Sequence, residues 1–491
     1  MKILIAVANY GTQNDRYLNQ LLTDYRSLPH EVDVVVLTNV PKNLGPDVEV
    51  KVGLPSRNPK SLPFAHKQVF ADRRNDYDLF IYSEDDTPVS NRNIRAFLAS
   101  TEVLNEREIA GFLRTEVGHN GKEYFPDAFD SWHWEPTSVQ QRGEYTFAFF
   151  NNEHAACYIL TRAQLASVIQ SGGFLEGPHQ GKHQLLESAA TDVYTQCGFT
   201  KLICISHIDD FLVPHLANKY LSLEGCEVRR QISALMAIGR DERPSDRLLE
   251  TAAELPSLPW SKSYYEPAQR ELLSLVPENT RSLLSVGCGW GAVEGQLVQN
   301  GVEVVAVPLD SVISTCAEAR GVRTVSCDFK AAREELSNKR FDCILVLHVL
   351  HFLRDPLPIL ASYTELLSPG GSMIVGVPNF KYLKILWRSI QGWPGYRNLG
   401  SYDKTGVNVT THRVVQGWLK SCGLTVDSTV NALPERLRFF QRMPDFAAPA
   451  LAPKFIMRGR KHSSTTEHHL SDAFRRNRDS LTDMERREVF Q

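Results

Sequence analysis

The sequence predicts an α/β protein made of two domains, and three observations support this prediction. The chain has 491 residues, whereas a typical domain has about 100–200. Apolar residues make up 42% of it and charged residues 23%, the ordinary composition of a globular protein. Short apolar runs also alternate with amphipathic helical patterns along most of the chain, which indicates mostly parallel sheets covered by helices.

The N-terminal half contains seven runs with the length and composition of strands. They lie at Lys2–Val7, Val32–Leu37, Val48–Val52, Leu79–Tyr82, Gly111–Thr115, Ala155–Leu160 and Lys201–Ile205. Helical periodicity separates them at Asp15–Tyr25, Phe64–Arg74, Asn91–Leu104, Arg162–Ser171 and Ser188–Cys197. We therefore expect one α/β domain over residues 1–240.

Residues 241–260 are polar, contain proline and lack periodicity, which predicts a linker. A second β/α series begins at Leu283, and its last strand-like run is Lys454–Arg458, so the second domain is expected over residues 261–462. Residues 463–491 are mostly charged and predict a solvated tail, with room for a short helix at Ser471–Asn477.

Charge and cysteine usage exclude several classes of protein. A formal net charge of -3 argues against a nucleic-acid binder, which would carry a strongly basic domain. The nine cysteines include no Cys-x-x-Cys pair, so neither a zinc ribbon nor a redox motif is indicated, and a reducing cytoplasmic location is expected. The first apolar run stops at Asn9, too short for a signal peptide. No window approaches the roughly 18 apolar residues of a membrane span.

The strongest motif is the run Leu283-Leu-Ser-Val-Gly-Cys-Gly-Trp-Gly291, an apolar strand that leads into a glycine-rich turn and then a helix from Ala292. Gly287 and Gly289 allow a tight turn and let the backbone approach a ligand. The turn places that ligand at a helix N-terminus. Such a turn alone would fit an NAD-binding domain equally well.

The elements after the turn decide between these possibilities. A strand at Val302–Val307 leads to Asp310, about twenty residues past the loop, where a carboxylate can bind ribose hydroxyls. Further strands follow, one before Asp328 and one before His348 and His351. A Ser-Pro-Gly-Gly turn precedes the next strand, Ser372–Val377.

This order resembles the class I S-adenosylmethionine (SAM)-dependent methyltransferases, which implies a Rossmann-like domain that binds SAM. The resemblance assigns the methionine part of SAM to Gly287, Cys288, Gly289 and Gly291, the ribose to Asp310 and the adenine to Asp328. Two positions depart from the family pattern: Ser285 stands where an acid is usual, and Asp310 comes two residues after the usual acid position, which is Pro308. Asp310 could instead be a surface residue, with the ribose bound by backbone groups.

Two features point to the methyl acceptor. His348 and His351 flank the end of a strand, where either imidazole could accept the proton of a sugar hydroxyl; otherwise both pack beneath the next helix. Aromatic and basic residues alternate over Phe380–Asn408, a pattern that suits a carbohydrate acceptor or a hydrophobic lid.

In the N-terminal half, Glu84, Asp85 and Asp86 directly follow an apolar strand. Three adjacent carboxylates repel one another unless a cation neutralises them. A divalent cation that carries a diphosphate would do so through its preference for oxygen ligands. The alternative is an ordinary strand-to-helix turn in which an Asp caps the helix.

The arrangement resembles the GT-A glycosyltransferases, which carry a metal-binding acidic motif after a central strand. The resemblance implies Mn²⁺ or Mg²⁺ at Glu84, Asp85 and Asp86, completed by His207 or His215, and a UDP- or GDP-linked sugar as donor. Phosphate-binding cations are expected among His66, Lys67, Arg73 and Arg74, and sugar-stacking aromatics over Trp132–Phe150. Asp192, or else Glu187, is the implied general base.

The sequence therefore predicts a bifunctional glycan-modifying enzyme that transfers a sugar and a methyl group in polysaccharide biosynthesis. Fusion would give the second site its substrate at high effective concentration. Small-molecule and glycan substrates are expected, with peripheral contact to a lipid-linked acceptor and no nucleic-acid partner. One alternative is a methyltransferase whose N-terminal domain only binds the acceptor. Another is a non-enzymatic pair of binding modules.

Overall fold

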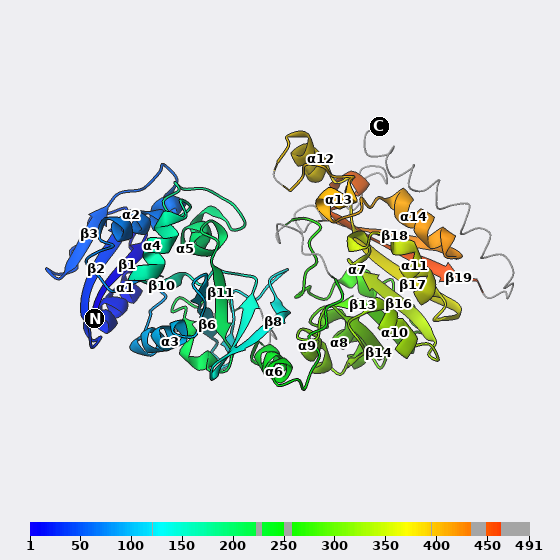
Figure 1. Cartoon of the computed structure of the whole chain (residues 1–491). Coiled ribbons are helices and arrows are strands. Elements are labelled where there is room, and N and C mark those ends of the chain that lie inside the picture. The colour runs from blue at the N-terminus through cyan, green and yellow to red at the C-terminus, as the bar shows by residue number, and fades with distance from the viewer. Residues whose placement is uncertain (120, 222–227, 250–257, 394, 434–447, 463–491) are drawn as a thin grey trace. The chain divides into compact units, whose positions relative to one another are not determined.

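The computed structural model describes all residues except 120, 222–227, 250–257, 394, 434–447 and 463–491. Contacts divide the chain into two compact units, Met1–Arg243 and Pro244–Gln491 (Figure 1). The helix predicted at Ser471–Asn477 and the central part of the predicted linker lie outside the described residues.

The N-terminal unit is built on a five-stranded sheet of order β10-β4-β1-β2-β3. Strands β1 to β4 are parallel and β10 is antiparallel to β4. Their bounds are β1 Lys2–Asn9, β2 Glu31–Thr38, β3 Val48–Val52, β4 Leu79–Glu84 and β10 Cys157–Thr161. The inner strands read as continuous apolar runs because helices bury both faces of the sheet.

Two smaller sheets complete this unit. The first has the order β5-β11-β9-β8 and the second β12-β6-β7. Their bounds are β5 Glu108–Ala110, β6 Leu113–Val117, β7 Glu123–Tyr124, β8 Trp134–Arg142, β9 Tyr145–Phe150, β11 Thr200–Cys204 and β12 Leu212–Pro214. The β8–β9 hairpin was not predicted. Its Trp134 and Phe150 are buried against each other at a ring-centroid distance of 5.0 Å, so these two aromatics serve the core.

The helices of the N-terminal unit begin where capping residues stand. Ser90 and Thr161 each accept a hydrogen bond from the backbone three residues on, and each receives one in return, as in a capping box. The bounds are α1 Asp15–Arg26, η1 Pro59–Phe64, α2 Ala65–Asp72, α3 Asn91–Thr101, α4 Arg162–Gln170, α5 Leu185–Thr195, η2 Ile208–Asp210 and α6 Val228–Gly239.

The C-terminal unit contains a seven-stranded sheet of order β15-β14-β13-β16-β17-β19-β18. The first five strands are parallel, and β19 is antiparallel to both of its neighbours. Their bounds are β13 Ser282–Cys288, β14 Glu303–Pro308, β15 Arg323–Thr324, β16 Phe341–Leu347, β17 Leu367–Pro378, β18 Leu424–Ala432 and β19 Lys454–Lys461. This is the Rossmann-like fold expected for this region.

The helices around this sheet include α7 to α11, which alternate with the strands, and α12 to α14, which lie between β17 and β18 in the chain. Their bounds are α7 Arg270–Leu273, α8 Ala292–Gln299, α9 Ser314–Glu318, α10 Phe329–Glu335, η3 Leu350–Phe352, α11 Pro356–Thr364, α12 Leu383–Ile390, α13 Tyr402–Thr405, α14 His412–Ser421 and α15 Ala448–Leu451.

Each unit has a point where the strand order reverses, between β1 and β4 in one and between β13 and β16 in the other. Ligands of open α/β sheets bind beyond the carboxyl ends of the strands at such a point. The acidic run follows β4, and the glycine-rich turn follows β13. Both sequence motifs therefore lie at the place in their sheet that favours ligand binding.

Residues 244–249 and 258–260 of the predicted linker belong to the C-terminal unit. The amide of Leu248 donates to the carbonyl of Leu309 at 2.7 Å, and the amide of Ser311 donates to that of Asp246 at 3.0 Å. Trp260 is buried in a small cluster with Phe380 and Tyr396. The stretch indicated a linker because it is mostly polar and its few apolar side chains show no periodicity. Trp260 nevertheless packs in this cluster of the C-terminal unit.

Candidate functional sites

The glycine-rich turn of the C-terminal unit adopts the backbone that its sequence requires. Gly287 has φ +84° and Gly291, the N-cap of α8, has φ +81°, a region that L-residues with a Cβ rarely enter. A Cβ on Gly287 would lie 2.5 Å from Cγ1 of Val349. The turn therefore needs glycine both for its dihedrals and for its packing.

Next to this turn, a buried acid compensates for the missing family acid at Ser285. Ser285 is fully buried, and its hydroxyl donates to Oε1 of Glu294 at 2.6 Å. Glu294 lies in the first turn of α8 and lines the cavity beside the glycines. Sequence reasoning missed Glu294, although a Glu in the first turn after a glycine loop is a signal that could have been weighed.

Both predicted nucleoside-binding acids begin a helical turn in this structure. Oδ1 of Asp310 accepts the amides of Val312 and Ile313 at 2.8 and 2.7 Å. Oδ1 of Asp328 accepts those of Lys330 and Ala331 at 2.9 and 2.7 Å and caps α10. Asp310 is buried and Asp328 is exposed. A carboxylate has a second oxygen, so neither cap excludes a ligand contact.

A segment at residues 262–266 lies across the glycine turn. The amide of Trp290 donates to the carbonyl of Tyr264 at 2.9 Å, and Nζ of Lys262 donates to the carbonyl of Leu347 at 2.9 Å. A Cβ on Gly289 would lie 2.2 Å from the carbonyl oxygen of Tyr264. In this structure it is therefore the chain's own backbone that approaches Gly289.

Glu266 holds this covering segment electrostatically. Its Oε1 lies 3.4 Å from Nε2 of His348 and 3.3 Å from Nζ of Lys454. Burial opposes ionisation of Glu266, but nearby cations, Lys454 and Lys262 among them, lower its pKa to about 2. The segment is therefore clamped by a largely buried carboxylate that is ionised at neutral pH.

The two predicted histidines have different surroundings. His348 lines the cavity beside the glycines, and burial lowers its pKa well below the usual value. Its Nδ1 is buried and has no hydrogen-bond partner among the described residues. His351 is fully buried, with Nε2 2.7 Å from the carbonyl oxygen of Trp260, and burial lowers its pKa to about 3. Of the two, His348 faces the cavity.

The residues around this cavity suit SAM, but the cavity is too small to contain it. The cavity measures about 20 Å³, whereas small-molecule sites measure about 300–1,000 Å³. It is lined by residues 262–266 on one side and the glycine turn on the other. Binding of SAM in this cavity would therefore require residues 262–266 to move aside.

The N-terminal unit contains a much larger cavity, of about 680 Å³. Glu84, Asp85 and Asp86 all line it. Nδ2 of Asn9 donates to Asp85 at 2.6 Å, and Nδ2 of Asn14 donates to Asp85 and Asp86 at 2.7 and 3.2 Å. The side-chain amides of Asn9, at the end of β1, and of Asn14, just before α1, thus hold the acidic run in place.

The three acids differ in protonation. Burial raises the pKa of Glu84 to about 8, and its Oε1 has no partner within the described part of the chain. Burial likewise raises the pKa of Asp85 to about 6. Burial opposes the ionisation of Asp86, but its contact with His215 leaves its pKa below the usual value. Glu84 is therefore the acid that stays mostly protonated at neutral pH, whereas Asp85 and Asp86 are mostly ionised.

Of the two predicted metal-ligand histidines, the fold brings only His215 to the acids. Nε2 of His215 lies 3.3 Å from Oδ2 of Asp86, and its Nδ1 lies 2.5 Å from Oε1 of Glu116. His207 is exposed, contacts Ser206 and does not line the cavity. In the residues that the structure describes, no group of three or more His, Cys, Asp or Glu side chains is arranged to hold a metal ion. The geometry thus gives no support to Mn²⁺ or Mg²⁺ at this site.

The two predicted catalytic acids lie on α5 but face different surroundings. Asp192 is fully buried, pairs with Nζ of Lys67, and has Nε2 of His179 3.3 Å from its Oδ1. It does not line the large cavity, whereas Glu187 does. The burial and pairing of Asp192 favour a structural role.

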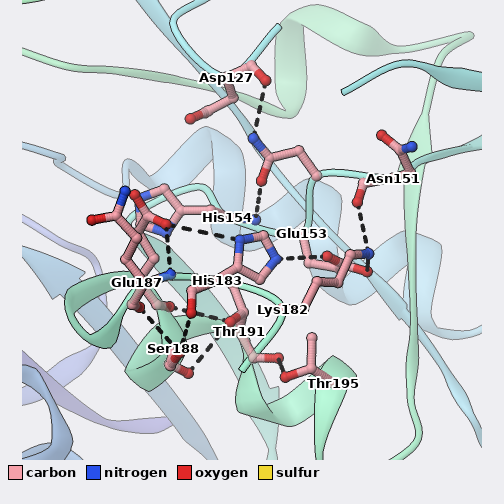
Figure 2. Close-up of polar contacts among 12 residues, drawn as sticks. Asp127, Asn151, Glu153, His154, Lys182, His183, Glu187, Ser188, Thr191 and Thr195 are labelled. Carbon is pink, nitrogen blue, oxygen red and sulfur yellow. Dashed lines mark hydrogen bonds and ion pairs between the residues drawn. The ribbon is translucent and has the colours of Figure 1, made fainter. Parts of the chain in front are cut away.

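A histidine that sequence reasoning missed faces the same cavity. Figure 2 shows His183 between Glu153 and Glu187, with Nε2 2.8 Å from Oε2 of Glu153 and Nδ1 3.9 Å from Oε2 of Glu187. Its ring stacks on Trp132 at 5.0 Å. Lys182 donates to the other oxygen of Glu153 at 2.6 Å. No local motif marks His183, because its partners come from distant positions in the chain.

The cations predicted to bind phosphates do not line the large cavity. His66 is buried with Nε2 2.5 Å from the hydroxyl of Tyr158, and Arg73 donates to Glu49. Arg114, Lys60 and Lys219 line it instead. Arg114 already forms two hydrogen bonds with Asp127, at 3.0 and 2.5 Å.

Comparison with known proteins identifies one of the two units. Residues 284–375 match a family described as "Methyltransferase domain". An uncharacterized methyltransferase of Mycobacterium tuberculosis is 30% identical over 121 residues, which is 24% of this chain and 59% of that protein. A ubiquinone biosynthesis O-methyltransferase of Cereibacter sphaeroides is 32% identical over 114 residues, 22% of this chain and 46% of that protein. The chain spans about half the length of these relatives.

Solved structures of SAM-dependent methyltransferases are also similar to part of the chain. A SAM-dependent methyltransferase from Methanosarcina mazei has 15% identity and a TM-score of 0.31, covering 40% of this chain and all of that one. One from Mesorhizobium loti has 16% identity and a TM-score of 0.29, covering 39% and 96%. The family match and the relatives support a SAM-dependent methyltransferase domain in the C-terminal unit. The GT-A resemblance of the N-terminal unit stays a prediction.

Proposed function

We propose that the C-terminal unit transfers the methyl group of SAM to an oxygen nucleophile on a glycan acceptor. The observation that carries this proposal is the glycine turn at the strand reversal between β13 and β16, inside the region that matches a methyltransferase family. SAM would supply an electrophilic methyl group; the chain must bind the cofactor, orient the acceptor and accept a proton.

The binding residues follow from their places around the turn. Gly287, Gly289 and Gly291 line the cavity and would border the methionine part of SAM, whose ammonium group suits the carboxylate of Glu294. Cys288, the fourth predicted residue, is buried and does not line the cavity. Asp310 and Asp328 follow β14 and β15, where the ribose and the adenine are expected. Oδ1 of each carboxylate caps the helical turn that follows it.

His348 is the group that we assign to the acceptor's proton. Its low pKa keeps the imidazole neutral, and its unpartnered Nδ1 can accept a proton while Glu266 stabilises the cation that forms. His351 is the weaker candidate because it is fully buried and does not line the cavity beside the glycines.

The test separates binding from proton transfer. His348→Ala should lower the rate of methyl transfer to a saccharide acceptor by about 10²–10⁴-fold and leave the Kd of SAM within about threefold. An unchanged rate would remove His348 from the reaction. No SAM binding by the folded parent would remove the proposed function itself.

For the N-terminal unit we propose binding of a nucleotide sugar and transfer of its sugar. The observation in favour is the cavity of about 680 Å³, in which the acids after β4 face His183 and Trp132. The metal part of the prediction has no geometric support, so no step is assigned to a metal. His183, oriented by Glu153, replaces Asp192 as our candidate base, with Glu187 beside it.

Thermal shift with UDP- and GDP-sugars, with and without Mn²⁺, tests this second function, since a specific ligand raises the melting temperature by mass action. Asp86→Asn should abolish the shift, and it should also lower the melting temperature of the free protein somewhat, because His215 loses its charged partner. Stabilisation by no nucleotide sugar would favour the alternative in which this unit only binds the methyl acceptor. The cytoplasmic location also stays a prediction.

A further inference from the structure

The residues between β17 and α14 form a small protrusion on the C-terminal unit. Figure 1 shows its helix, α12 (Leu383–Ile390), beyond α13 and away from the strands of the sheet. The protrusion is fixed to the unit by Ile385 and Tyr396, which are buried against Trp260 and Phe380. It is therefore a folded part of the domain.

The apolar face of α12 points toward solvent. A surface helix normally turns its i, i+3, i+4 and i+7 stripe toward the core. Here that stripe consists of Leu383, Leu386, Trp387 and Ile390, all of which are exposed, while Ile385 on the opposite face is the buried residue of the helix. Trp387 is 63% exposed and Ile390 81%. Trp393, just past the helix, is also exposed.

The exposed apolar side chains of the C-terminal unit are concentrated on the protrusion. Within the described residues of the C-terminal unit, every exposed large hydrophobic side chain lies between Leu383 and Trp393. Exposed apolar side chains are normal when scattered, but a contiguous group indicates an interaction surface.

The charges around the stripe are of one sign. Residues 379–402 contain Lys381, Lys384, Arg388 and Arg397 and no Asp or Glu. Lys381, Lys384 and Arg397 are exposed, and none forms an ion pair within the described part of the chain. Arg388 stacks on Trp393 at 5.0 Å from the ring centroid, which keeps that indole in place.

We propose that this protrusion binds an anionic lipid surface, with the stripe of α12 inserted at the level of the headgroups. Apolar and tryptophan side chains beside lysines and arginines are the features by which interfacial helices bind membranes. Basic residues near the surface are attracted to anionic headgroups. None of the helices in the described part of the chain is long and apolar enough to cross a bilayer, so the contact is peripheral. It would hold the methyltransferase domain at a membrane, where lipid-linked acceptors reside.

The proposal is tested by sedimentation of the full chain with vesicles of phosphatidylcholine, with or without phosphatidylglycerol. The parent should bind the anionic vesicles, and added salt should weaken this binding. Trp387→Ser with Ile390→Ser should weaken it at least about tenfold, because two large side chains lose their burial in lipid. Lys381→Glu with Lys384→Glu should also weaken it about tenfold.

The matched control is Val117→Ser with Leu175→Ser, two exposed apolar residues of the N-terminal unit, which should leave vesicle binding unchanged. Absence of binding by the parent, or equal binding by the Trp387/Ile390 variant, overturns the proposal. Self-association of the parent that this variant abolishes, without vesicle binding, would instead assign the stripe to a contact between two copies. SAM titration of the same variant reports separately on the proposed methyltransferase, since the substitutions lie outside its cavity.

Discussion

The two units place their motifs at equivalent points of their sheets but differ in the space around them. The acids after β4 line an open cavity of about 680 Å³, while the glycine turn after β13 borders one of about 20 Å³. The family match, residues 284–375, covers the region that holds the glycine turn. A local motif thus indicates which ligand a loop can bind. Whether the site is open depends on the chain segments around it.

The two cavities differ in volume because residues 262–266 cover the glycine turn. Residues 262–266 belong to the C-terminal unit and are clamped through Glu266 and the Tyr264–Trp290 hydrogen bond. In the N-terminal unit, the side-chain amides of Asn9 and Asn14 contact the acids, which still line a cavity of about 680 Å³. The following predictions examine this difference, starting with the largest effect.

Asp192→Asn should destabilise the N-terminal unit by about 3–5 kcal/mol, because it leaves the ammonium group of Lys67 buried without its partner. Urea denaturation measures this change. The matched control is Asp403→Asn, since the Arg354–Asp403 pair is exposed and its loss should change little. If Asp192→Asn were as stable as the parent and lost sugar transfer, the carboxylate would be a base after all, as the sequence predicted.

Gly287→Ala should destabilise the C-terminal unit by about 3 kcal/mol. The left-handed backbone costs about 1–2 kcal/mol, and the contact of the new Cβ with Val349 adds about 1–3 kcal/mol. Gly301 has the same φ of +84° but nothing within 4 Å of its Cβ position, so Gly301→Ala should show the backbone cost alone. Equal losses in the two variants would mean that the turn is not tightly packed.

Lowering the pH should weaken the clamp at Glu266. Its pKa in the folded protein is about 2, below its ordinary 4.5. Its contribution is therefore complete above pH 4.5 and is lost as the pH falls from 4.5 toward 2, to a total of about 3 kcal/mol. Denaturation of parent and Glu266→Gln across this range should show a steeper loss in the parent. Parallel curves would contradict an ionised clamp.

Asp328→Ala should cost about 1 kcal/mol of stability through loss of the α10 cap, while Asp328→Asn should preserve it. Both should weaken SAM binding, by about 1–3 kcal/mol, if the second carboxylate oxygen accepts a hydrogen bond from adenine. Titration calorimetry measures the affinities. An Asn variant with the parent's affinity would leave Asp328 only its capping role.

Sequence patterns predicted the parallel strands well because both faces of these sheets are buried. β1, β4, β13 and β16 are continuous apolar runs that end at chemically distinctive residues. The β8–β9 hairpin escaped prediction because its aromatic residues also suited a sugar-binding surface. Trp260 escaped because a single buried side chain in a polar stretch produces no periodicity.

Site residues could be predicted only where the chemistry lies in one stretch of chain. Glu84, Asp85 and Asp86 reach a cavity together, and so do the glycines of the turn. Side-chain contacts such as Glu294 with Ser285 beside the glycine turn, or His183 with Glu153, depend on how strands and helices meet. Sequence alone also could not distinguish His215 from His207, since each follows a short strand, β12 and β11 respectively.

Calorimetric titration of SAM into the full chain tests the central claim most directly. We expect one SAM bound per chain in the parent and in Asp86→Asn, whose substitution lies in the other unit. In folded Gly287→Ala the affinity should fall at least about tenfold, or 1.4 kcal/mol. No binding by the parent, or the parent's affinity in Gly287→Ala, would contradict SAM binding at the glycine turn.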